Sequence, residues 1–152
     1  MEFLETCVNP KKDEAYYWCG CKLIALDLTT LAERVLWDAP EGYLKTMTNV
    51  SSDGKYILGG RMKDLSDTIE TDLLHGYVGF AEMWEAHPHS YIFKTPVEGG
   101  ETKIVHEENC WIGHVNTSPK MPGIVSFCHE GPWEKVDNRI WCLNHEIGRA
   151  HV

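Results

Sequence analysis

The stretch NVSSDGKYILGG, residues 49–60, contains the pattern from which the fold can be predicted. A small polar turn leads through a glycine-containing tip into a β-rich strand. Two other stretches repeat this pattern, VNPKKDEAYYW at residues 8–18 and VNTSPKMPGIVSF at residues 115–127. Strands of this length with turn residues between them are typical of antiparallel all-β proteins.

Each of these three stretches is followed by further short strands. The second strand of each unit has an apolar alternation, and the first two units end with a third strand. These strands are KLIALDL (22–28), SYIFKTPV (90–97), NRIWCLN (138–144), ERVLWDAP (33–40) and TKIVHEEN (102–109). A recurring unit of this size predicts an all-β, incomplete β-propeller of about two and a half to three blades built from antiparallel sheets. The third unit is expected to stop after its second strand, and a β-sandwich is the alternative fold.

The domain organisation follows from where this pattern is interrupted. Residues 1–145 are expected to form one partial propeller domain, with an insertion at about residues 62–88 inside the second unit. An insertion of this length is either a wall or lid of a functional site or a solvated surface loop. The last residues, EIGRAHV (146–152), resemble the translation of a sequencing-library adapter, so we expect them to be a non-native tail.

Composition excludes several classes of protein. The chain has 152 residues, is 43% apolar and carries a net charge of −9. Its size and apolar content are those of a globular domain, and the negative charge argues against nucleic acid as a partner. No apolar run is long enough to cross a membrane. The six cysteines include no CxxC pair, which favours free thiols in a reducing compartment over a structural zinc site.

Residues 127–141, FCHEGPWEKVDNRIW, combine groups that suit an acidic sugar. Trp133 could offer a flat apolar face to a pyranose ring, and Arg139 could bind a carboxylate through its two-pronged guanidinium. Each residue also has a structural alternative. The tryptophan could lie in the core, and Arg139 could form a surface ion pair with Asp137 or Glu134, which contributes little energy.

Two histidines and a second tryptophan extend this candidate site. Trp111 could provide another sugar platform, while His114 and His129 titrate near neutrality and can donate or accept protons. Such groups suit β-elimination of a uronate, in which the proton on C5, α to the carboxylate, is removed. The alternative is that each histidine stabilises a turn. The HPH segment at residues 87–89 could place a pair of metal ligands, but no third ligand lies near it in the sequence.

Three quoted segments carry a resemblance to a known family. GHVNTSP (113–119), FCHEGPWEKVDNRIW and DLTTLAERVLWDAP (27–40) closely resemble the bacterial oligogalacturonate lyases. The likeness extends at lower stringency across residues 1–145. The CHEGP…VD.R.W pattern matches in both residue type and spacing, so it is more specific than a lone motif.

The resemblance implies a fold and an activity. Members of that family are seven-bladed β-propellers that cleave digalacturonate or its unsaturated form by β-elimination. They are largely cytoplasmic and use a divalent metal, typically manganese (Mn²⁺). By the same resemblance, Arg139 is the catalytic arginine, and the expected substrate-binding residues are His114, His129, Glu130 and Trp133.

The resemblance also implies that part of the site is missing. The family's presumed base, a histidine, and its metal ligands, His and Gln side chains, lie downstream of this chain, so no metal ligand is assigned here and the fragment itself is expected to be inactive. His145 lies too early to be that base. Two alternatives stay open: a non-catalytic propeller used for binding or as a scaffold, and a glycoside hydrolase that uses paired carboxylates such as Glu130 and Asp137.

Overall fold

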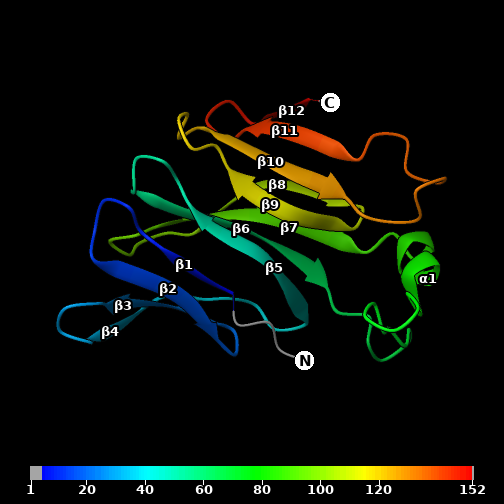
Figure 1. Ribbon diagram of the computed structural model, residues 1–152, viewed down its shortest axis with the longest axis horizontal. Coiled ribbons are helices and arrows are strands. Elements are labelled where there is room, and N and C mark those ends of the chain that lie inside the picture. The colour runs from blue at the N-terminus through cyan, green and yellow to red at the C-terminus, as the bar shows by residue number, and fades with distance from the viewer. Residues whose placement is uncertain (1–4, 152) are drawn as a thin grey trace.

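The computed structural model describes residues 5–151. The chain folds into three antiparallel sheets of four strands each, one after another (Figure 1). The first sheet contains β1 (Thr6–Val8), β2 (Glu14–Cys19), β3 (Lys22–Asp27) and β4 (Glu33–Asp38). The second contains β5 (Tyr43–Val50), β6 (Tyr56–Lys63), β7 (His89–Pro96) and β8 (Lys103–Asn109). The third contains β9 (Ile112–Thr117), β10 (Ile124–His129), β11 (Ile140–Asn144) and β12 (Arg149–His151).

Within every sheet the strands are hydrogen-bonded in the order in which they occur along the chain. Each sheet is therefore a simple meander. The first strands of neighbouring sheets also contact each other, β1 with β5 and β5 with β9. Meandering four-stranded sheets packed face to face, with their first strands adjacent, are consecutive blades of a β-propeller. The expected incomplete all-β propeller is confirmed.

The sequence patterns located two or three strands in each sheet but missed the first strand, β1, β5 or β9. The third sheet is also longer than expected. In it β12 pairs with β11, placing Leu143 opposite Ala150 and Cys142 opposite His151. The expectation that the third unit stops after its second strand is therefore wrong. The non-native origin proposed for residues 146–152 stays a prediction.

Two apolar clusters hold the three sheets together. Alternating residues on a strand point to opposite faces, so each sheet can pack on both sides. The cluster between the first and second sheets includes Tyr16, Trp18, Leu23, Ile57 and Phe93. The cluster between the second and third sheets consists of Leu58, Ile92, Ile112, Val115, Val125, Phe127 and Leu143.

Gly60 in β6 allows β5 to bulge against it. The pairing of β5 with β6 shifts between Lys45 and Thr48, so Thr46 and Met47 lie opposite this single glycine. A Cβ atom on Gly60 would lie 2.1 Å from Thr46 Oγ1 and 3.0 Å from Val115 Cγ2. Any side chain here would therefore collide with both the bulge and the third sheet.

We expect Gly60→Ala to lower the free energy of unfolding by about 1 to 2 kcal/mol, the usual cost of overpacking. Urea denaturation of the chain measures this loss. Adding Thr46→Ala removes the colliding hydroxyl, so the double variant should recover part of the stability, and the double-mutant cycle gives the coupling. A Gly60→Ala protein as stable as the parent would contradict the packing described.

The insertion lies between β6 and β7. It contains one short helix, α1 (Phe80–Glu85), and an isolated bridge between Asp72 and Val78. Figure 1 shows the insertion and α1 at one end of the sheets, beside the loop that joins β10 to β11. No helix among residues 5–151 is long and apolar enough to span a bilayer.

Candidate functional site

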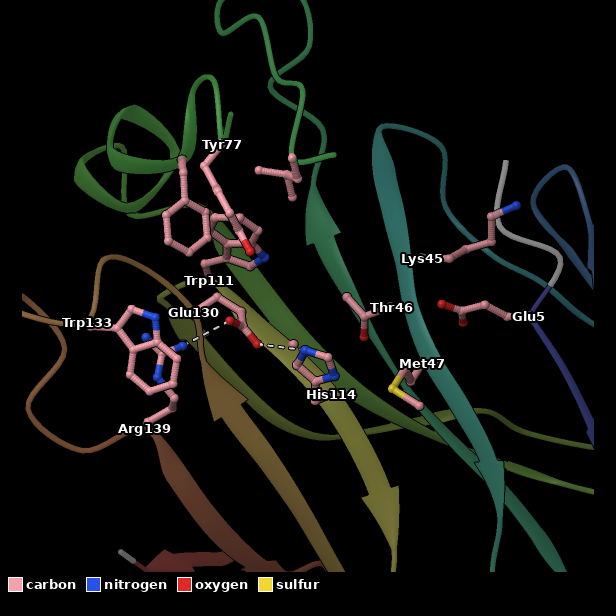
Figure 2. A pocket seen from close by; sticks show the side chains of 13 residues that line it. Glu5, Lys45, Thr46, Met47, Tyr77, Trp111, His114, Glu130, Trp133 and Arg139 are labelled. Atoms are coloured by element: carbon pink, nitrogen blue, oxygen red, sulfur yellow. Dashed lines mark hydrogen bonds and ion pairs between the residues drawn. The ribbon is translucent and has the colours of Figure 1, made fainter. Parts of the chain in front are cut away.

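A pocket of about 420 Å³ opens at the end of the sheets where the insertion lies (Figure 2). It is lined from four directions: the N-terminal segment, β5, the insertion, and the third sheet with its β10–β11 loop. The lining residues are Glu5, Lys45, Thr46, Met47, Leu73, Tyr77, Phe80, Trp111, Gly113, His114, Glu130, Trp133 and Arg139. The volume lies within the range of small-molecule sites.

Arg139, directly before β11, is held by three contacts at this pocket. Its Nη1 donates a hydrogen bond to Glu130 Oε2 at 3.1 Å, and its Nη2 donates one to the Gly131 carbonyl oxygen at 2.6 Å. The guanidinium carbon lies 4.4 Å from the ring centroid of Trp133. Neither Asp137 nor Glu134 is its ion-pair partner, because Glu130 takes that role. The guanidinium is thus fixed in orientation and keeps its charge at the pocket.

Trp133 is an exposed aromatic surface. Its exposed fraction is 82%, so the core alternative for this residue is wrong. One face of the indole covers the Arg139 guanidinium, a cation–π arrangement. An apolar ring left this open beside a pocket is typical of a binding surface.

A β-bulge directs His114 towards the same place. The pairing of β10 with β9 shifts between Ser126 and Cys128, so two residues of β9 lie opposite one residue of β10. His114 has a φ of 47°, in the left-handed region that a non-glycine residue rarely adopts. Bulges commonly redirect side chains at functional sites. Figure 2 shows the His114 ring pointing towards Glu130.

Glu130 lies between the two basic residues. Its Oε1 is 3.3 Å from His114 Nε2, within ion-pair distance, although the geometry is not that of a hydrogen bond. Its other oxygen accepts from Arg139. The carboxylate is largely buried, and a Cβ atom on Gly113 would lie only 2.7 Å from it. Glu130 therefore contacts both Arg139 and His114, and these two basic side chains are the groups that an incoming anion would meet.

Two more ionisable residues line the far side of the pocket, Lys45 on β5 and Glu5. Burial raises the pKa of Glu5 to about 7, despite a side-chain contact with Thr48 and the nearby Lys45, which both lower it. Close to neutral pH this carboxyl is therefore only partly charged. It repels an acidic ligand less than an ordinary glutamate would.

His129 does not share the pocket with Arg139. Neighbouring residues of a strand face opposite ways, and His129 Nε2 lies 2.7 Å from Glu108 Oε1 on β8. Burial works to lower the pKa of His129, but contacts with Cys110 and Glu108 outweigh it and raise the pKa to about 9. The residue lines a separate hollow with Trp84, Asp137 and Trp141. The structure thus brings together four of the five expected site residues and separates the fifth.

The same separation bears on the hydrolase alternative. Glu130 lines the main pocket, whereas Asp137 lines the hollow on the other side of the β10–β11 loop. A glycoside hydrolase needs both carboxyl groups on either side of one scissile bond. This pair is not arranged for that chemistry.

The described residues do not fit a metal ion. Within residues 5–151, no group of three or more His, Cys, Asp or Glu side chains is placed to hold one. Of the HPH pair, His87 is exposed before β7 begins, while His89 Nδ1 contacts the Tyr43 hydroxyl at 3.1 Å. His145 is buried away from the pocket, 2.9 Å from the Pro122 carbonyl oxygen, and burial lowers its pKa.

Sequence reasoning missed several pocket residues, among them Glu5, Lys45, Tyr77 and Phe80. Lys45 lies on β5, the strand whose pattern was overlooked. Tyr77 and Phe80 belong to the insertion, where aromatic residues close together in the sequence were the available signal. Phe80 packs edge-to-face on Trp111, with ring centroids 5.4 Å apart. Side chains of the insertion thus line one side of the pocket.

Comparison with known proteins identifies this arrangement. The model of the oligogalacturonate lyase family matches residues 3–150. An oligogalacturonide lyase of Pectobacterium atrosepticum is 30% identical over 141 residues, which cover 91% of this chain and 35% of the relative. The chain thus spans about a third of the length of the curated relatives it matches.

Solved structures give the same result. An oligogalacturonate lyase in complex with manganese superposes with a TM-score of 0.82 at 27% identity, covering 97% of this chain and 39% of that one. A putative TolB from Agrobacterium tumefaciens is 14% identical and superposes with a TM-score of 0.59. The match covers 95% of this chain and 46% of the TolB chain, and it supports the fold alone. The family match covers nearly the whole chain. The chain belongs to the oligogalacturonate lyase family.

Proposed function

We propose that the protein of which this chain is a part cleaves short oligogalacturonates, digalacturonate or its unsaturated form, by β-elimination. The observation that carries this proposal is the fixed guanidinium of Arg139 at the pocket, beside the exposed indole ring of Trp133. A guanidinium beside an aromatic platform matches the two features of a uronate, its carboxylate and its apolar ring face.

In this proposal the substrate carboxylate binds Arg139 and the sugar ring packs on Trp133. Removing the C5 proton places negative charge on a group that is already anionic, and the guanidinium stabilises that charge. The electron pair left on C5 forms the double bond between C4 and C5. The bond from C4 to the glycosidic oxygen then breaks, and that oxygen takes up a proton. We assign neither proton transfer to a side chain of this chain.

Glu130 holds the guanidinium in place during this step. Glu130 accepts a hydrogen bond from Arg139 through one oxygen, which fixes the guanidinium, and its other oxygen faces His114. A positioned charge stabilises a transition state without reorganising. We expect Glu130 to be a positioning residue and not a group that binds the substrate carboxylate, which it would repel.

Manganese enters only at the level of the whole protein. The described residues do not fit a metal ion. We propose that the whole protein binds Mn²⁺ through residues that this chain does not contain, which is supported by the related lyase solved with manganese. We also propose a cytoplasmic location, supported by the six free cysteines.

The test is the product that the whole protein forms from digalacturonate. Elimination gives a conjugated uronate with ultraviolet absorbance, and its mass shows that no water has been added. Hydrolysis would give new reducing ends without that absorbance and with a mass one water larger. If the ligand binds but neither product forms, the protein is a non-catalytic binding module and the proposal is wrong.

A further inference from the structure

The insertion presents an ordered column of aromatic rings to the pocket. Trp111 packs edge-to-face on Phe80, and Phe80 packs edge-to-face on Tyr77, with centroid distances of 5.4 and 5.5 Å. Such pairs are stabilising beyond the area they bury. Tyr77 is the last ring of the column, and 67% of it is exposed. It therefore has a ring surface that no described residue covers.

The backbone holds Tyr77 in this place. Its φ is 55°, in the left-handed region, and it lies between Gly76 and Gly79, which also have positive φ. A Cβ atom on Gly79 would lie 2.2 Å from the Glu70 carbonyl oxygen, so the turn is tightly packed. Non-glycine residues kept in such conformations cluster at ligand-binding sites. Figure 2 shows Tyr77 and Trp111 together above Glu130.

The base of the insertion is docked on the loop that carries Trp133. The Trp84 ring of α1 packs on Gly131, where a Cβ atom would lie 2.2 Å from Trp84 Cδ1. Lys135 Nζ donates a hydrogen bond to Glu85 Oε1 at 2.7 Å and lies 5.0 Å from the Trp84 ring centroid. These contacts keep the aromatic column in a fixed position relative to Trp133 and Arg139.

The pocket therefore has two aromatic surfaces on neighbouring sides. Trp133 with Arg139 forms the first, which suits one uronate ring and its carboxylate. Tyr77 forms the second, which has an open ring surface and a hydroxyl but no cation of its own. A linked second sugar ring would extend from the first surface towards the second, and the volume of about 420 Å³ leaves room for more than one ring.

We propose that Tyr77 determines the length of ligand that the site prefers, by packing against the second ring of an oligogalacturonate while Arg139 binds the carboxylate of the first. This inference rests on the proposed function, because it takes oligogalacturonate as the ligand. It adds a specificity-determining residue in the insertion, outside the segment that contains Glu130, Trp133 and Arg139.

Binding of galacturonate and of digalacturonate to the chain, measured by calorimetry, tests this inference. The parent chain should bind the dimer more tightly than the monomer. Tyr77→Ala should weaken binding of the dimer about tenfold, the size of a lost aromatic stacking contact, and leave binding of the monomer unchanged. Tyr77→Phe keeps the ring and should bind the dimer like the parent.

The matched control is Leu74→Ala, an exposed residue of the same turn that does not line the pocket. It should bind both sugars like the parent, and unchanged circular dichroism of all variants shows that the insertion stays folded. The inference is overturned if the parent does not prefer the dimer. It is also overturned if Tyr77→Ala weakens both sugars equally or neither, or if Leu74→Ala reproduces its effect.

Failure of this inference can be told apart from failure of the proposed function. The calorimetric test needs binding only, whereas the proposed function is tested by the product of the whole protein. Binding of the dimer that depends on Tyr77, without any unsaturated product, would contradict the lyase proposal and leave the inference standing. Turnover with no contribution from Tyr77 would do the reverse.

Discussion

Replacing Arg139 with alanine in the whole protein is expected to lower kcat for the unsaturated product by about 10²- to 10³-fold, the usual loss when one preorganised charge-stabilising group is removed. The reason is that the substrate carboxylate gains charge only as the C5 proton leaves. An interaction that strengthens at that point affects kcat more than ground-state binding. Steady-state ultraviolet absorbance of the product measures the effect.

The substitution Arg139→Lys separates charge from geometry. Lysine keeps a positive charge but cannot bridge Glu130, the Gly131 carbonyl and a ligand with one planar group. We therefore expect its kcat to lie between those of the parent and of Arg139→Ala. Loss of the contact with Trp133 would change the tryptophan fluorescence of the free protein.

Arg34→Ala is the matched control for this experiment. Arg34 pairs with Glu14 and donates to the Val97 carbonyl oxygen, and it does not line the pocket. Its removal should leave kcat close to that of the parent. The assignment of Arg139 is contradicted if Arg139→Ala raises KM alone with kcat unchanged, which indicates uniform binding, or if Arg34→Ala loses as much activity.

The fold could be predicted where strands are rich in apolar residues. Strands β2, β3 and β7 have consecutive buried residues, and β10 alternates between buried and partly buried ones, so all four are clear in the sequence. The first strands were missed for a physical reason. YLKTMTNV, the sequence of β5, has one face on the core and another towards the pocket end, and it is interrupted by a bulge opposite Gly60. The alternation of apolar and polar residues along β5 is therefore interrupted.

The candidate site could be predicted only where it is local in sequence. Glu130, Trp133 and Arg139 belong to one strand–loop–strand segment, and the loop brings them together whatever the other sheets do. His114 reaches them because β9 pairs with β10. His129 was grouped with them for its nearness in sequence, although adjacent residues at a strand end face opposite ways. Tyr77 meets the pocket only through packing between two sheets.

The side chain of His129 instead belongs to an ionic cluster centred on Glu108, between the second and third sheets. Its Nε2 donates to Glu108 Oε1 at 2.7 Å, and His106 Nε2 lies 3.3 Å from the same oxygen. The His129 ring also packs against Trp141, with centroids 4.9 Å apart. These side chains are mostly buried, so leaving one of their charges unpaired would cost desolvation free energy.

The pKa values of this pair define a window of maximum stability. Burial acts to raise the pKa of Glu108, but the contacts with His106 and His129 lower it from 4.5 to about 2. The pKa of His129 is raised from 6.5 to about 9. The glutamate contribution is present above pH 4.5 and is lost as the pH falls towards 2, and the histidine contribution is present below pH 6.5 and is lost as the pH rises towards 9.

We expect Glu108→Gln to lower the free energy of unfolding by about 2 to 3 kcal/mol within the window between these limits, because it leaves His129 without its charged acceptor. The same variant should also show a smaller decline in stability between pH 6.5 and 9, because Glu108 supplies part of the raised pKa of His129 and Cys110 supplies the rest. Urea denaturation at a series of pH values measures both effects on the 152-residue chain.

Glu107→Gln is the matched control, one residue away on the same strand. The side chain of Glu107 is 63% exposed, against 28% for Glu108. Its pair with His89 is a surface contact, so the substitution should change stability by less than about 1 kcal/mol. Equal losses in the two variants, or an alkaline decline in Glu108→Gln as large as that of the parent, would show that the contact between the second and third sheets does not depend on the Glu108–His129 ion pair. The difference between two adjacent glutamates thus isolates burial, because the chemical change is the same in both.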